Sequence, residues 1–167
     1  ENYFAQHFVS LLAQHSDKVA WLNFHSIKNK GAISTLLDNL NVEKVIADDI
    51  SVDFKRARLE EYDDYLFFKI KSALPKKNAA YLEEERISFL IHQQFIISFQ
   101  EKSSDHFPDV RDRIVQQRGK IRVKKSDFLV FRLLEAITDN YFEVLEDTIN
   151  SIEMLEAKIV LNAKNEI

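Results

Sequence analysis

The chain has 167 residues, of which 46% are hydrophobic, and a net charge of −4. It is long enough to bury one core and too acidic overall for a general nucleic-acid binder. It has no cysteine and two glycines, which excludes a disulfide framework, a thiolate metal site and the glycine-rich loops that bind nucleotides. No apolar run reaches the roughly 18 residues of a membrane-spanning helix, and the N-terminus lacks a signal-peptide pattern. We therefore expect the chain itself to be soluble and cytosolic in character.

The N-terminal third is predicted to alternate helix and strand. Apolar residues at helical spacing predict a helix over residues 1–16, and the β-branched and aromatic run at residues 18–24 predicts a strand. A second helix is expected to begin near Lys30, and a short third helix fits residues 42–50.

In the middle of the chain the apolar period changes to two. Alternation over residues 65–71, 86–92 and 95–100 predicts three strands, which should be antiparallel because the links are short. A turn is expected over residues 75–80. One face of this sheet is apolar and the other is half apolar, so helices should cover both.

The last element is predicted to be a long helix. A helix over residues 105–117 and a basic connector come first, and then apolar residues with a seven-residue period, including Phe131, run from Lys125 to the end. At 1.5 Å per residue this helix would reach roughly 55–60 Å, which is more than the width of a small domain. The expected fold is α/β, with a mixed, largely antiparallel central sheet between helices (αβα). We divide the chain into a domain, residues 1–124, and a long helix, residues 125–167.

Several short sequences occur in an order that is similar to one known family. They are WLNF at 21–24, DDI at 48–50, YDDYLFFK at 62–69, ISFLI at 87–91, ISFQE at 97–101, VRDRI at 110–114 and YFEVLE at 141–146. Together they resemble the cytoplasmic domain of the CorA magnesium and cobalt transporters. The resemblance implies a homopentamer at the cytoplasmic face of the cell membrane. In that family a very long helix leads from each domain to a pore marked by Gly-Met-Asn. This chain contains neither a membrane segment nor Gly-Met-Asn, so we expect it to stop before the stalk.

The resemblance also implies a regulatory cation site. In the family, acidic residues at the positions of Asp49, Asp48 and Glu135 help to bind Mg²⁺, or Co²⁺, between neighbouring cytoplasmic domains. Carboxylate oxygens suit Mg²⁺, but adjacent aspartates on a helix point about 100° apart and cannot both chelate one ion directly. The alternative is a solvated Asp pair that caps the helix end. Because the neighbour's ligand is missing, we expect weak occupancy in this chain alone.

Other chemistry is not indicated. Between Arg111 and Lys125 there are seven basic residues and one acid, without aromatic residues for base stacking, so we expect a solvated loop there. The five histidines, His106 among them, show no metal-ligand spacing and are expected at the surface or core edge. No catalytic arrangement is found, and we predict neither an enzyme nor a small-molecule substrate.

The interpretation is thus an ion-sensing regulatory domain of a CorA-type Mg²⁺/Co²⁺ channel, gated by Mg²⁺ bound between subunits. Two alternatives stay open. One is a soluble interaction module that oligomerises through its C-terminal helix without ion chemistry. The other is a Zn²⁺-transporting member of the same superfamily.

Overall fold

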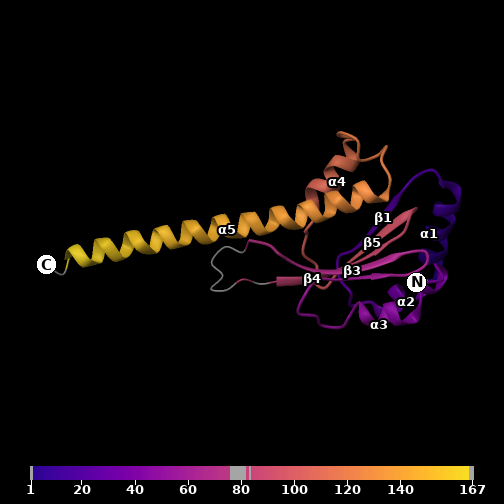
Figure 1. The fold of residues 1–167 in the computed structure, drawn as a ribbon, viewed down its shortest axis with the longest axis horizontal. Coiled ribbons are helices and arrows are strands. Elements are labelled where there is room, and N and C mark those ends of the chain that lie inside the picture. Colours follow the sequence, from indigo (N-terminus) through magenta and orange to yellow (C-terminus); the bar gives the residue numbers. More distant parts are fainter. Residues whose placement is uncertain (1, 76–81, 83, 166–167) are drawn as a thin grey trace.

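The computed structural model describes residues 2–75, 82 and 84–165, and in this part of the chain a five-stranded sheet forms the centre (Figure 1). Its strand order is β1-β5-β4-β3-β2. The strands are β1 (Ala20–Phe24), β2 (Arg58–Glu61), β3 (Leu66–Ala73), β4 (Glu84–Ile91) and β5 (Phe95–Gln100). β1 pairs with β5 in parallel, and the other neighbours are antiparallel. The mixed, largely antiparallel sheet expected from the sequence is confirmed.

Helices cover both faces of this sheet. The first layer consists of α1 (Asn2–Gln14), α2 (Lys30–Asn39) and α3 (Lys44–Asp49), and the second of α4 (Pro108–Val115) and α5 (Ser126–Asn165). Local chemistry sets two of the helix starts. The Asn29 side chain accepts a hydrogen bond from the Ala32 amide at 3.1 Å and caps α2, and Pro108 opens α4, where a missing N–H is tolerated.

The period-two pattern of the strands divides the interior into two cores. On β5, Phe95, Ile97 and Phe99 face the α1–α3 layer, whereas Ile96 faces the α4–α5 layer. Phe67 and Phe68 on β3 separate in the same way. All six residues of β5 are buried because this strand lies between two others and under both layers.

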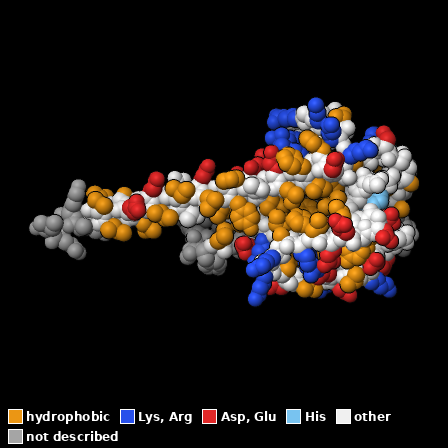
Figure 2. All heavy atoms as spheres, in the orientation of Figure 1, with side chains coloured by type: hydrophobic (Ala, Val, Ile, Leu, Met, Phe, Trp, Pro, Cys, Tyr) orange, Lys and Arg blue, Asp and Glu red, His pale blue; other side chains and the backbone are white. Residues whose placement is uncertain are grey.

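The first part of α5 packs in the core, and the rest of the helix projects from the domain. Leu129, Leu133 and Ile137, spaced by four, are buried against the sheet and belong to the second core. From Leu145 to Leu161 the large apolar side chains are half exposed or more, and Figure 2 shows apolar side chains along the part of α5 that leaves the domain. The expected apolar stripe is wrong at Phe131, which is 59% exposed. The residues two positions before and two after it lie against the sheet instead.

One strand of the sheet was not predicted from the sequence. It is β2, whose four residues, RLEE, carry a single apolar side chain. The expected turn at residues 75–80 lies almost wholly outside the described residues. Among the described helices, none combines the length and the apolar character needed to cross a membrane.

Candidate functional site

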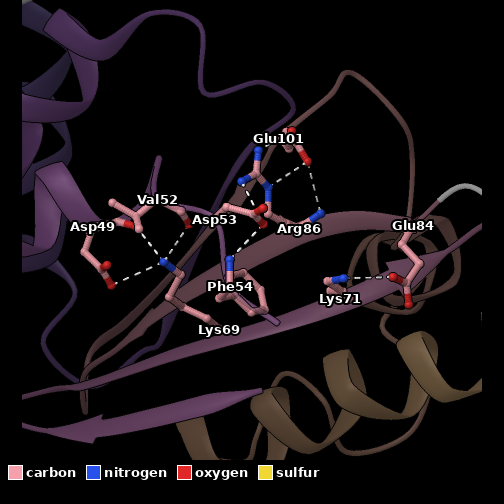
Figure 3. A network of polar contacts seen from close by, with 9 residues as sticks. All are labelled: Asp49, Val52, Asp53, Phe54, Lys69, Lys71, Glu84, Arg86 and Glu101. Atoms are coloured by element: carbon pink, nitrogen blue, oxygen red, sulfur yellow. Dashed lines mark hydrogen bonds and ion pairs between the residues drawn. The ribbon is translucent and has the colours of Figure 1, made fainter. Parts of the chain in front are cut away.

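Asp48 and Asp49 end helix α3, and their carboxylates have different surroundings. Oδ2 of Asp49 accepts a hydrogen bond from Nη2 of Arg58 at 2.5 Å. It accepts a second from Nζ of Lys69 at 3.3 Å (Figure 3). Asp48 is exposed and forms no side-chain hydrogen bond or ion pair within the described residues. One carboxylate is therefore held by two cations, and the other is open to solvent or to a neighbouring molecule.

Lys69 is a buried lysine that the sequence did not reveal. Its side chain is 1% exposed. Nζ donates to the backbone carbonyls of Asp49 at 2.6 Å and Val52 at 3.1 Å, and it lies 5.0 Å from the centre of the Phe54 ring. Burial lowers the pKa of Lys69, and the Asp49 carboxylate opposes that shift. The ammonium group satisfies the carbonyl of Asp49, the last residue of α3, where the helix dipole favours a cation, and the carbonyl of Val52 in the loop that follows.

A second ion pair holds the loop that follows α3. Arg86 on β4 donates from Nη2 to Oε1 of Glu101 at 2.5 Å and from Nε to Oε2 at 3.1 Å. Nη1 of Arg86 lies 3.3 Å from Oδ1 of Asp53 (Figure 3). The Arg86 guanidinium lowers the pKa of Glu101. Lys69 and Arg86 thus contact this loop at Val52 and Asp53, a few residues after Asp49.

Glu135 lies on the other side of the sheet. It belongs to α5 and forms an ion pair with Arg132 one turn earlier. Because α3 and α5 belong to opposite layers, one chain does not bring Glu135 together with the two aspartates. Among the described residues, no group of three or more histidine or acidic side chains is arranged to hold a metal ion. A cation at either place would therefore need ligands from a second subunit or from water.

A buried polar cluster lies near the start of α4. His106 is 1% exposed, so its expected place at the surface or core edge is wrong. Its Nε2 lies 2.9 Å from Oε2 of Glu85, and its Nδ1 lies 3.0 Å from Oγ of Ser72. Glu85 also accepts from the Ser104 hydroxyl and from the Lys102 amide. Burial by itself would raise the pKa of Glu85, but these hydrogen bonds outweigh it and the pKa is lowered.

The alternation of β4 separates Glu85 from its neighbour Glu84, because Glu85 lies two residues before Ile87 and shares its face of the strand. The strand was predicted to begin at residue 86, and this signal was therefore missed. Since its partners satisfy both carboxylate oxygens, the cluster joins β3, β4 and the loop before α4 rather than forming an open site.

Comparison with known proteins places this fold in a family. Residues 16–167 match the model of the CorA-like Mg²⁺ transporter protein family. The chain is 30% identical over 151 residues to the cobalt/magnesium transport protein CorA of Thermotoga maritima, in an alignment that covers 90% of this chain and 43% of that protein. The chain thus spans less than half of that relative's length.

Two solved structures share the fold. The soluble domain of CorA from Methanocaldococcus jannaschii superposes with a TM-score of 0.67 at 18% identity, covering 84% of this chain and 55% of that one. The ZntB cytoplasmic domain from Vibrio parahaemolyticus superposes with a TM-score of 0.61 at 20% identity, covering 78% and 53%. With the family model matched over nearly the whole chain, this protein belongs to the CorA-like Mg²⁺ transporter family.

Proposed function

We propose that this chain is the cytoplasmic, ion-sensing domain of a divalent-cation transporter that moves Mg²⁺ and Co²⁺ and assembles as a homopentamer. The observation that carries the proposal is the family match over residues 16–167. The name of the Thermotoga maritima relative, a cobalt/magnesium transport protein, supports the same substrates.

The regulatory Mg²⁺ is proposed to bind between subunits at Asp49, assisted by Asp48 and Glu135. The open carboxylate of Asp48 suits an ion that keeps several of its waters. Asp49 has a fixed orientation, but its Oδ2 is shared by Arg58 and Lys69. An ion that approaches Asp49 competes with Arg58, whose side chain is 47% exposed and also pairs with Glu60 at 2.9 Å. This competition weakens the site, as suits a sensor that responds near cellular ion concentrations.

The two layers of the fold suggest how the ligands are divided between subunits. Asp48 and Asp49 lie on the α1–α3 layer and Glu135 lies on the α4–α5 layer. We assign the aspartates to one side of the contact between neighbours and Glu135 to the other. Such a head-to-tail contact is the kind that closes into a ring.

Gating follows from the charge at this contact. With Mg²⁺ bound, the carboxylates are neutralised and the closed packing is stabilised. When internal Mg²⁺ falls, the carboxylates repel one another, the packing loosens and the pore opens. The ion shifts this equilibrium only by its higher affinity for the closed state.

The test uses the full-length protein in vesicles, with ion flux measured against internal Mg²⁺. Asp49→Asn keeps the shape and removes the charge, so the Mg²⁺ concentration for half-closure should rise about tenfold while flux at low Mg²⁺ persists. Asp38→Asn, an exposed aspartate on α2, is the matched control and should leave half-closure unchanged. If Asp49→Asn closes at the parent concentration, Asp49 is not the sensor. If the parent moves neither Mg²⁺ nor Co²⁺, the transport proposal itself fails.

One observation favours an additional role in association. Leu145, Ile152 and Ile159 on α5 are each at least half exposed and share one helix face. Such a face suits packing against another helix, which supports assembly alongside ion sensing.

The flux assay with Zn²⁺ in place of Mg²⁺ tests the alternative that the protein transports Zn²⁺ rather than Mg²⁺ and Co²⁺.

A further inference from the structure

A cavity of about 510 Å³ lies between α4, the connector that precedes α5, and strand β1. Its volume falls within the roughly 300–1,000 Å³ typical of small-molecule sites. It lies apart from Asp48 and Asp49, on the opposite side of the sheet, and the proposed ion sensing does not use it.

The floor of this cavity is apolar and rigid. Val19 and Trp21 from the β1 region, Ile114 from α4 and Leu129 from α5 line it. The Trp21 indole is fixed in place, because Nε1 donates to Oγ of Ser98 at 2.9 Å and the ring meets Phe107 edge to face. An apolar body therefore finds a preformed surface here.

The rim is positively charged. Lys18, Arg111, Arg122 and Lys124 line the cavity, and no Asp or Glu among the described residues does. Asp105 neutralises Arg111, but the other three form no ion pair within the described part of the chain. Figure 2 shows Lys and Arg side chains gathered around α4. Uncompensated cations beside apolar surface in a chain of net charge −4 indicate an anionic ligand.

The backbone of the connector explains how it reaches this position. Gln117 and Gly119 have φ angles of 56° and 68°, and these left-handed residues turn the chain back after α4. Ile121, 8% exposed, anchors the returning segment in the second core. Arg122 and Lys124, which follow Ile121, line the cavity, whereas Arg118 and Lys120 before it do not.

We propose that this cavity binds a small organic phosphate, with its phosphate on Lys18, Arg122 and Lys124 and its apolar body on Val19, Trp21 and Ile114. Arginine and lysine are the usual partners of phosphate, and arginine binds it with two parallel hydrogen bonds. The sequence predicted only a solvated basic loop, because the apolar floor comes from the β1 region, about 100 residues earlier in the chain.

Trp21 is the single tryptophan of the chain, so its fluorescence reports binding in this cavity. Trp21 emission is recorded while ATP, hexyl phosphate or inorganic pyrophosphate is added without Mg²⁺. ATP and hexyl phosphate represent two sources of the same chemistry, a nucleotide and an alkyl phosphate. At least one should bind about tenfold tighter than pyrophosphate, which has charge but no apolar body, and the tighter of the two identifies the source.

Matched double variants separate the cavity from the general charge of the loop. Arg122→Gln with Lys124→Gln should weaken binding of the tighter probe about tenfold, whereas Arg118→Gln with Lys120→Gln should weaken it less than about twofold. All four side chains are exposed, so folding should persist. Equal losses in both variants overturn the proposal, as does pyrophosphate binding as tightly as the organic phosphates. An absence of saturable binding, or binding only to phosphatidylglycerol vesicles, also overturns it.

Discussion

Lys69 and Asp49 are joined twice, because the lysine ammonium donates to the backbone carbonyl of Asp49 at 2.6 Å and to its carboxylate at 3.3 Å. The residue proposed to bind a regulatory ion is thus also the partner of a buried charge. Removing the Asp49 side chain entirely would leave Lys69 less compensated, whereas asparagine keeps an oxygen for it. For this reason Asp49→Asn, and not Asp49→Ala, separates sensing from stability.

Replacing Lys69 should destabilise the fold. Lys69→Met keeps the approximate volume but leaves the carbonyls of Asp49 and Val52 without their donor. We expect a loss of about 3 kcal/mol in the free energy of unfolding, measured by urea denaturation. Lys71→Met is the control, because Lys71 is on the same strand with its side chain 32% exposed and pairs with Glu84 at the surface. Its loss should stay below about 1 kcal/mol, and similar losses in the two variants would contradict the buried role of Lys69.

Removing the competitor of the proposed ion should strengthen sensing. In Arg58→Gln, Oδ2 of Asp49 loses the 2.5 Å bond from Arg58 and becomes more available to Mg²⁺. The full-length variant should therefore close at an internal Mg²⁺ concentration severalfold lower than the parent, measured by ion flux. Arg56→Gln, an exposed arginine two residues earlier, should leave the closing concentration unchanged. A higher closing concentration in Arg58→Gln would show that Arg58 assists the ion rather than competing with it.

Acid should destabilise the fold in part through Glu85. Its folded-state pKa lies below the ordinary value of 4.5, so its contribution is complete above about pH 4.5 and is lost as pH falls through the lower folded value. Glu85→Gln should be about 1–3 kcal/mol less stable than the parent at neutral pH, and the difference should shrink below pH 4.5. Urea unfolding at several pH values measures both. An equal pH dependence in the variant and the parent would show that Glu85 does not respond to acid as described.

The projecting part of α5 should make the chain associate weakly. At micromolar concentration we expect a monomer or a weak, concentration-dependent oligomer in sedimentation velocity, because the exposed apolar side chains of one projecting helix offer little area to bury. Leu145→Lys with Ile152→Lys should abolish any association through the exposed face. Asn150→Lys with Ser151→Lys adds the same charge at exposed polar positions and should weaken association less. A tight pentamer that persists on dilution would contradict this expectation.

Much of the fold follows from local pattern in the sequence. The strands at β3, β4 and β5 alternate with period two, and this pattern also assigned helices to both faces. The edge strand β2 has no such pattern, since three of its four residues are charged and its pairing depends on β3. Phe131 was wrongly placed in the covered stripe of α5 because apolar residues occur on more than one face of that helix, and only the sheet determines which face is covered.

The sequence predicted less of the candidate site than of the fold. Adjacency and the resemblance identified Asp48 and Asp49, and helix geometry predicted that they diverge, as they do. Nothing in the sequence indicated that Arg58 and Lys69 meet at Asp49, because these contacts join positions 9 and 20 residues apart through the tertiary fold. Whether Asp49, Asp48 and Glu135 bind Mg²⁺ stays a prediction, as does the division of the chain at residue 125.

The parallel pairing of β1 with β5 has a consequence for biosynthesis. Ala20 aligns with Phe95 and Phe24 aligns with Phe99, so β1 has no strand partner until residues 95–100 have left the ribosome. Contacts this far apart in sequence form slowly, because a long loop must close before they contribute. Until then Trp21, Leu22 and Phe24 are an unpaired, apolar strand, the kind of segment that chaperones recognise. Folding of the nascent chain should therefore wait for β5, and slowing translation before residue 95 should increase aggregation rather than reduce it.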